Sequence, residues 1–242
     1  MANPFYAPGE QRAAKVNDLF ATVARRYDLL NDLQSFGLHR RWKRRAVALA
    51  QPQPGEHALD ICCGTGDLAQ LLAQTGADVT AVDFSEAMLA VAEQRPKAKG
   101  KGQNLKFQQG DALHLPFPAA SFDVVTIGYG LRNLASVDAG LRELQRVLKP
   151  GGRLVILEFG KPANSLWRGL YFAHLRYVTP LLGRLFCGNA AAYAYILESL
   201  QNYPAQAGVA QKLRDLGCTD VCVHDLLGGA MSLHFARRGF QP

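Results

Sequence analysis

Apolar residues in the first 50 positions recur at the spacing of a helix. They lie three or four residues apart, with a break at Gly37, at Leu19, Phe20, Val23, Tyr27 and Leu30 and then at Trp42, Ala46 and Leu49. This spacing predicts two short helices that precede the core of the fold.

Between residues 57 and 159 the pattern changes to short apolar runs that alternate with helical segments. Runs typical of buried strands occupy residues 57–62, 78–83, 105–109, 122–127 and 154–159. Helices are predicted at 67–74, after the N-cap residue Ser85, and at 137–148. Such alternation predicts an α/β fold with a Rossmann-like, mostly parallel sheet and right-handed crossovers.

The rest of the chain departs from this alternation. Residues 161–203 are rich in aromatic side chains and contain Pro180 and Gly183, which predicts a helical lid. Beyond it, a helix that ends at Gly217 and strands at 220–225 and 231–237 predict an antiparallel edge pair. We therefore expect one domain in four parts: an N-terminal helical cap (1–50), a core (51–160), a lid or substrate insertion (161–203) and a segment that completes the core (204–242).

Candidate binding residues fall where the predicted strands end. In an open parallel sheet, ligands bind beyond the carboxyl ends of the strands. Gly64 and Gly66 follow the first strand and let the backbone turn sharply and approach a ligand. Asp83 ends the second strand, where a carboxylate can accept hydrogen bonds from ribose hydroxyls. These positions predict a site for a nucleotide-containing cofactor.

Two cofactors fit this glycine turn. Residues 64–69 also match the G-x-G-x-x-A pattern of dinucleotide folds, which would suit an NAD-dependent oxidoreductase. Asp67, at the start of the following helix, would repel a pyrophosphate and favour a sulfonium, which points to S-adenosyl-L-methionine. Alternatively, Asp67 is only a charge that suits the helix dipole.

Composition narrows the class of protein. A 242-residue chain that is 48% hydrophobic can bury a large core, and it contains neither an apolar run of about 20 residues nor a signal peptide. We therefore expect a cytoplasmic protein. Its five cysteines are odd in number and lack C-x-x-C spacing, so we expect neither a disulfide framework nor a metal site.

The chain carries a net charge of +7, and most of the excess lies in the first 50 residues. Such a cluster can bind nucleic acid, bind an anionic membrane surface or simply be solvated by water. No recognised RNA-binding motif accompanies it, so we expect no nucleic-acid partner. An RNA-binding protein or RNA methyltransferase is kept as an alternative.

Motifs along nearly the whole chain resemble those of the ubiquinone/menaquinone biosynthesis C-methyltransferases. The resemblance rests on residues 23–32, 37–43, 59–68, 110–112, 122–133, 148–152, 157–159, 198–200 and 203–204. Its most specific elements are Tyr27-Asp28 with Asn31-Asp32, and Gly130-Leu131-Arg132-Asn133. The resemblance implies a class I S-adenosylmethionine-dependent fold that methylates a polyprenylated quinol.

The same resemblance implies that Thr65, Asp83, Asp111 and Ala112 line the cofactor pocket, with Asp111 near the adenine amino group. Two positions depart from the family pattern. Asp111 stands where many members have Asn, and Gly128 stands where some have a cofactor-contacting Ser. We therefore do not assign Gly128 as a ligand.

Carbon methylation of a quinol requires the ring hydroxyl to lose a proton, so that the neighbouring carbon can attack. We expect Arg132 to stabilise the phenolate that forms. His39 is the candidate base, because its ordinary pKa is near neutrality. Tyr27 and Asn31 would cover the substrate. Tyr27 and His39 could equally serve only in packing.

We expect demethylmenaquinol to be the substrate, and a ubiquinone-pathway benzoquinol or dual specificity remains an alternative. The lid aromatics could line a tunnel for an isoprenoid tail or merely pack the lid on the sheet. Arginines at 168, 176 and 184 are compatible with a peripheral membrane contact, and the sequence is compatible with a homodimer.

Overall fold

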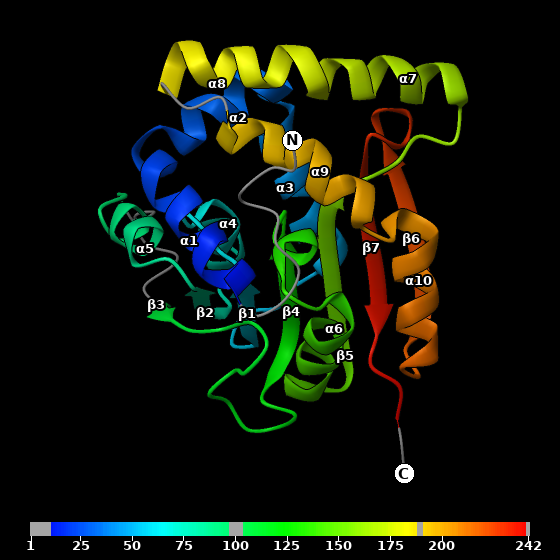
Figure 1. Cartoon of the computed structure of the whole chain (residues 1–242). Helices are drawn as coiled ribbons and strands as arrows, with labels where there is room; N and C mark the ends of the chain where they lie inside the picture. Colours follow the sequence, from blue (N-terminus) through cyan, green and yellow to red (C-terminus); the bar gives the residue numbers. More distant parts are fainter. Residues whose placement is uncertain (1–10, 97–103, 188–190, 241–242) are drawn as a thin grey trace.

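A computed structural model describes residues 11–96, 104–187 and 191–240. A sheet runs through the centre with helices on both faces (Figure 1), and its order within these ranges is β3-β2-β1-β4-β5-β7-β6. The strands are β1 His57–Ile61, β2 Asp78–Asp83, β3 Leu105–Gln109, β4 Phe122–Gly128, β5 Leu148–Phe159, β6 Thr219–Leu226 and β7 Met231–Arg237.

Strands β1 to β5 pair in parallel, whereas β7 pairs antiparallel with both β5 and β6. This confirms the predicted α/β fold with an antiparallel edge pair. The start of β5 was misplaced by the sequence pattern. Leu148 already pairs with Phe122, and the register then shifts until Arg153 pairs with Val124, so the glycine pair between them interrupts a strand rather than preceding it.

Side chains on both faces of the sheet are buried. In β1, Ala58 packs against helices α3 and α4, whereas Leu59 and Ile61 pack on the opposite face with α6. The core helices are α4 Asp67–Ala73, α5 Glu86–Glu93, α6 Val137–Val147 and α10 Ala205–Asp215. A sheet covered on both faces leaves its strand ends as the place for a ligand.

The cap contains α1 Gln11–Val23, a 3₁₀ turn η1 Ala24–Arg26, α2 Tyr27–Ser35 and α3 Leu38–Ala50. The predicted break at Gly37 is confirmed, since Phe36 and Gly37 adopt left-handed φ values of 51° and 73°. The prediction of two helices was wrong. The 3₁₀ turn divides the first of them, and no glycine or proline there marks the division. The first ten residues of the predicted cap lie outside the described residues.

The lid consists of α7 Ser165–Ala173, a π-helical turn η3 His174–Val178, α8 Thr179–Cys187 and α9 Ala191–Asn202. Helices α7 and α8 lie end to end across the top of Figure 1, above α2 and α9. The division of the chain into four parts stays a prediction. Within the described ranges, no helix is both long and apolar enough to cross a bilayer.

Candidate active site

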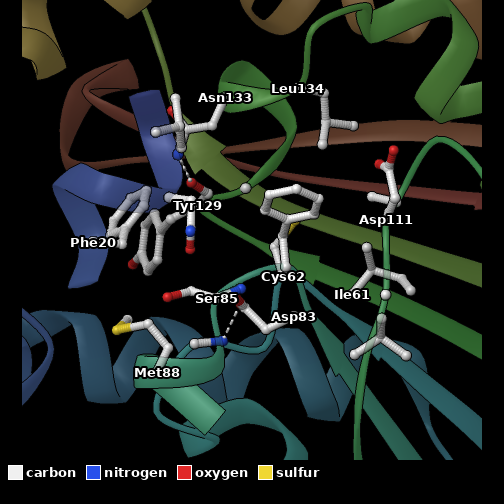
Figure 2. Close-up of a pocket in the computed structure, with 18 of the residues that line it drawn as sticks. Phe20, Ile61, Cys62, Asp83, Ser85, Met88, Asp111, Tyr129, Asn133 and Leu134 are labelled. Carbon is white, nitrogen blue, oxygen red and sulfur yellow. Dashed lines mark hydrogen bonds between the residues drawn. The ribbon is translucent and has the colours of Figure 1, made fainter. Parts of the chain in front are cut away.

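Two cavities lie side by side, the first beyond the carboxyl ends of β1, β2 and β4 and the second beyond those of β4 and β5. The first, which we call the sheet cavity, is lined by residues that include Asp83, Ser85, Met88, Asp111 and Asn133 (Figure 2). The second, the lid cavity, is lined by residues that include His39, Arg132, Trp167, Thr179 and Tyr195. Phe20, Tyr27 and Tyr129 line both cavities, so these three rings form a wall that the cavities share.

The turn after β1 forms one side of the sheet cavity. Gly64 lines it and has a φ of +55°, in the left-handed region that glycine adopts most readily. Its backbone N–H donates to Asp83 Oδ2 at 2.7 Å. The glycine turn and the second strand are therefore joined at the place where the sequence predicted a ribose.

Asp83 is the acidic centre of the sheet cavity. Besides Gly64, the backbone N–H of Ser85 donates to its Oδ1 at 2.9 Å. Burial raises the pKa of Asp83, and these backbone hydrogen bonds oppose the rise. Each carboxylate oxygen accepts more than one hydrogen bond, so Asp83 can still bind ribose hydroxyls. The buried Ser85 hydroxyl, which has no partner among the described residues, lies beside it.

Asp111 and Ala112 also line this cavity, and their assignment to the cofactor stays a prediction. Asp111 Oδ1 accepts a hydrogen bond from the Leu113 N–H at 2.9 Å, and the side chain is 40% exposed. Its second oxygen faces only His114, at 3.5 Å. A carboxylate in this position can accept a hydrogen bond from an exocyclic amino group. The residues of the cavity therefore fit the ribose and adenine of S-adenosylmethionine.

Thr65, Gly66 and Asp67 lie outside the lining of the sheet cavity. The Thr65 hydroxyl donates to Asp28 Oδ1 at 2.8 Å, which turns it toward the cap. Gly66, with a φ of +81°, is needed for packing, because a Cβ there would come within 2.9 Å of the Phe107 ring. The assignments of Thr65 and Gly66 to the cofactor stay predictions.

The Asp67 carboxylate binds two cations of the protein. Lys43 Nζ donates to its Oδ2 at 2.7 Å, and Arg95 pairs with both Asp67 and Asp28. The interpretation of Asp67 as a partner for a sulfonium is therefore wrong, since these ion pairs already occupy the carboxylate. They tie the cap helices α2 and α3 to the core.

The lid cavity has a volume of about 450 Å³, which is typical of a small-molecule site. Side chains from α1, α2, α3 and the lid enclose it, and most of its wall is apolar or aromatic. Among the described residues, no three His, Cys, Asp or Glu side chains gather to hold a metal ion. The cavity therefore suits an organic ligand with a large apolar part.

Arg132 reaches the lid cavity from the turn after β4. It is 5% exposed, and its Nη1 donates to Glu158 Oε1 at 2.6 Å and to the Tyr129 carbonyl at 2.7 Å. Burial alone would lower the pKa of Arg132, but the interactions with Glu158, Tyr195 and Tyr27 together outweigh it, so the pKa is raised. The guanidinium is therefore a fixed, permanent cation beside the shared wall. Glu158 lies in a motif that the sequence analysis quoted, near the end of a predicted strand, but its role was missed.

His39 lies buried in the lid cavity with Asp32 behind it. His39 Nε2 and Asp32 Oδ1 are 2.8 Å apart, and Arg40 clamps the same carboxylate through two hydrogen bonds. Burial lowers the pKa of His39, which favours the neutral ring. Because a carboxylate only accepts, the Nε2 of a neutral ring carries the proton and Nδ1 is the acceptor. Asp32 was quoted in a motif, but its role was missed.

Tyr27 connects the two cavities. Its ring packs edge-on against Phe20, with the ring centres 5.9 Å apart. Burial raises the pKa of Tyr27, while a hydrogen bond with Asn31 and the charge of Arg132 oppose the rise. The phenol therefore stays protonated at neutral pH and can donate a hydrogen bond. All three residues that the sequence predicted to be catalytic, Tyr27, His39 and Arg132, thus line one cavity.

Several buried polar atoms of the lid cavity have no hydrogen-bond partner within the described ranges. They are Gln34 Nε2, His39 Nδ1, Tyr129 Oη and Thr179 Oγ1. A buried polar group without a partner costs about 1 to 3 kcal/mol, so such a concentration points to a ligand that supplies partners. The ligand must therefore carry polar groups within an otherwise apolar body.

The sequence matches known proteins over most of its length. Residues 9–238 match the family model described as the ubiE/COQ5 methyltransferase family. A curated ubiquinone/menaquinone biosynthesis C-methyltransferase of Ectopseudomonas mendocina is 43% identical over 97% of this chain and 92% of its own length. The corresponding protein of Azotobacter vinelandii is 41% identical over 97% and 93%.

Solved structures share the fold at much lower identity. An S-adenosylmethionine-dependent methyltransferase of Thermotoga maritima superposes with a TM-score of 0.64, at 18% identity over 91% of this chain and 99% of its own. A phosphoethanolamine N-methyltransferase of Haemonchus contortus, solved with S-adenosylhomocysteine, has a TM-score of 0.61 over 81% of this chain and 52% of its own, at 18% identity.

Proposed function

Because the chain belongs to the ubiE/COQ5 methyltransferase family, we propose that it methylates a ring carbon of a polyprenylated quinol, with demethylmenaquinol as its substrate. Family membership makes the chain an S-adenosylmethionine-dependent methyltransferase of quinone biosynthesis. It excludes the NAD-dependent oxidoreductase and the RNA-binding protein that the sequence left open.

The observation that carries the proposal is the pair of cavities with one shared wall. The sheet cavity holds Asp83 and Asp111 for the cofactor, and the lid cavity offers buried polar atoms inside an apolar enclosure. A quinol has that composition, since its two hydroxyls lie on an aromatic ring that carries an isoprenoid tail. Tyr27 and Tyr129 lie between the two, where methyl donor and ring must approach each other.

When bound, S-adenosylmethionine supplies an electrophilic methyl group on a sulfonium. The residues of the lid cavity then have to make a ring carbon nucleophilic. Arg132 stabilises the quinol oxygen as it becomes anionic, because a fixed cation lowers the energy of a nearby phenolate. Glu158 holds this guanidinium in place and leaves the pair with no net charge, so Arg132 acts through directed hydrogen bonding more than through net charge.

His39 takes the proton from the quinol hydroxyl, directly or through a water molecule. Its Nδ1 is buried in the lid cavity and lacks a partner among the described residues. Asp32 keeps the proton of the neutral ring on Nε2 and stabilises the imidazolium that forms. The hydroxyl proton would pass to His39 as the ring carbon bonds to the methyl group that the cofactor would supply, with the sulfur keeping the electron pair of the broken carbon–sulfur bond. The hydrogen on the methylated carbon would then leave as a proton, and His39 would return its proton to the oxygen, which restores the aromatic quinol.

A competition assay tests the preference for the naphthoquinol. The enzyme, labelled cofactor and equal amounts of short-tailed demethylnaphthoquinol and demethylbenzoquinol are incubated under a reductant, and label is followed into each ring. Preferential labelling of the naphthoquinol supports demethylmenaquinol. Equal labelling would make the enzyme dual-specific, and preferential labelling of the benzoquinol would assign it to the ubiquinone pathway.

A homodimer and a peripheral membrane contact belong to the same proposal. Sedimentation equilibrium across a range of protein concentrations tests the homodimer, because a dimer has twice the 26.4 kDa mass of the chain. A single species at the mass of the chain would contradict it.

A further inference from the structure

The outer surface of the lid exposes a row of large apolar side chains. Leu166 is 74% exposed, Tyr177 and Leu185 are each 68% exposed, and Leu170 and Leu181 are more than half exposed. They all belong to the continuous α7–η3–α8 segment at the top of Figure 1. We call this row the lid stripe. Clustered apolar exposure of this kind marks an interaction surface.

The π turn keeps the lid stripe on one side of the helix. Tyr171, Leu175 and Thr179 are buried at intervals of four residues, toward the cavity. In an α-helix each interval of four residues advances the face by about 40°. The π turn holds more residues per turn and so offsets this drift across η3. The opposite face consequently stays outward from Leu166 to Leu185.

Basic side chains accompany the lid stripe. Arg168, Arg176 and Arg184 are all exposed, and residues 165–185 contain no aspartate or glutamate. A helix that combines exposed leucines with arginines and lacks acidic residues suits the interface of an anionic bilayer, where leucines enter the acyl boundary and arginines meet the headgroups. If the lid stripe instead bound an apolar surface of another protein, nothing would require residues 165–185 to lack acidic side chains.

The lid stripe is continuous with the lid cavity. Leu170, Phe36 and Leu227 line this cavity and are also exposed, Phe36 by 89%. These three residues therefore form an apolar rim between the cavity and solvent. Against a bilayer, the rim would face the region that holds isoprenoid tails.

We propose that the lid stripe docks the protein in the plane of an anionic membrane, so that the lid cavity takes a polyprenylated quinol from the lipid. This inference rests on the proposed quinol methyltransferase function. Docking keeps the tail among the acyl chains while the ring enters the cavity. The docked face is the outward side of α7, η3 and α8.

Flotation with lipid vesicles tests the docking. The full chain is mixed with vesicles of phosphatidylglycerol and phosphatidylethanolamine, or of phosphatidylcholine alone. The wild type is expected to float with the anionic vesicles, and a Leu166→Glu, Leu181→Glu, Leu185→Glu variant is expected to bind at least about tenfold more weakly. None of these three residues lines either cavity. Phe240→Glu, which changes an 81% exposed ring beyond the end of β7, is the matched control and should float like the wild type.

A second measurement separates docking from catalysis. On a short-tailed, water-soluble quinol the triple variant should match the wild type, and on a long-tailed quinol in vesicles it should lose about tenfold in rate. Equal flotation of variant and wild type would overturn the docking. A wild type that methylates neither quinol would instead overturn the proposed function. A wild type that self-associates through leucines 166, 181 and 185 without floating would show that a second copy covers the lid stripe, which also contradicts the docking.

Discussion

Arg132 and Glu158 form a buried ion pair, with 2.6 Å between Nη1 and Oε1 and with the guanidinium 4.5 Å from the centre of the Phe159 ring. Glu158 is fully buried and also accepts the backbone N–H of Arg132 at 3.2 Å. Removal of either partner would leave an uncompensated charge, so a mutation at this pair affects folding as well as chemistry.

Arg132→Ala is expected to lose about 10²- to 10³-fold in kcat, because the developing phenolate loses a fixed donor. Cofactor affinity should stay near that of the wild type, because Arg132 does not line the sheet cavity. The same variant should unfold about 3 to 5 kcal/mol more easily, because Glu158 is left buried and unpaired. Fixed-time activity assays measure the loss of kcat, and urea titrations measure the loss of stability.

An Arg132→Ala, Glu158→Gln double variant separates stability from catalysis. Loss of the buried charge should restore most of the stability and none of the turnover. Arg132→Lys should recover little activity, since an ammonium lacks the planar fork of a guanidinium. An increase in KM alone, with kcat unchanged, would make Arg132 a binding residue and contradict the assigned role.

His39→Gln is expected to lower kcat/KM about 10²- to 10⁴-fold, because the proton acceptor is removed. In the wild type, kcat/KM should fall on the acid side only below the ordinary histidine pKa, since burial lowers the pKa of His39 and the ring must be neutral to act. Asp32→Asn should also reduce the rate. It should shift the fall of kcat/KM at acid pH to a still lower pH, because the carboxylate that favours the imidazolium is lost.

The half-buried His224 on β6, which lines neither cavity, provides the control for these two variants. A His224→Gln variant should keep both the rate and the pH profile of the wild type. An unchanged acid limb in His39→Gln would assign the proton transfer to another group.

Asp83→Ala should weaken S-adenosylmethionine binding by about 1 to 3 kcal/mol, as expected when a charged hydrogen-bond acceptor is lost. Asp83→Asn keeps an oxygen that can accept the hydrogen bond from the Gly64 N–H. This variant therefore separates the loss of the carboxylate from a distortion of the turn. Asp78→Ala, at the opposite end of β2, is the matched control. Titration calorimetry that finds wild-type affinity in Asp83→Ala would remove Asp83 from the cofactor site.

Asp60 provides a test of stability against pH. Burial raises its pKa to about 7, partly opposed by a hydrogen bond from Thr126 at 2.7 Å. A raised pKa means that the protonated acid favours the folded state. This stabilisation is complete below the ordinary aspartate pKa and is lost as the pH rises through about 7.

Asp60→Asn should therefore unfold less readily than the wild type at pH 8, by about 1 to 3 kcal/mol, and the advantage should shrink toward pH 5. Urea titrations at several pH values measure the difference. An advantage that stays constant with pH would show that Asp60 does not titrate in this range.

Only the reduced quinol is expected to accept a methyl group, because an oxidised quinone ring is electron-poor and offers no nucleophilic carbon. Labelled cofactor and a short-tailed demethylnaphthoquinone are incubated with and without dithionite, and the label is located by mass spectrometry. Equal labelling without dithionite would contradict the phenolate route. Label on oxygen would reassign the reaction as O-methylation.

The sequence predicted the limits of the strands β2, β3 and β7 well, because apolar residues recur along each of them and turn signals mark their ends. Elements without such signals were missed. The turn at Ala24–Arg26 contains neither glycine nor proline, and the start of β5 is hidden by the irregular pairing around Gly151.

At the site, the sequence predicted roles for Arg132 and His39 but did not predict their charged partners. Asp32 and Glu158 become partners only when the chain folds, and Asp67 illustrates the same limit. Its position at a helix start suggested a ligand, whereas Lys43 and Arg95, distant in sequence, neutralise it. Spacing along the chain predicts which backbone positions meet but not which charges pair across elements.

The wall of Phe20, Tyr27 and Tyr129 couples the binding of the two ligands. Because the same rings face both cavities, any shift that one ligand causes in them changes the free energy of binding the second. Thermodynamic linkage then requires the effect to be reciprocal: if the quinol tightens the cofactor by some factor, the cofactor tightens the quinol by the same factor. The demethylated product of the cofactor would have its own coupling to the quinol, and the same three aromatic side chains would carry both couplings.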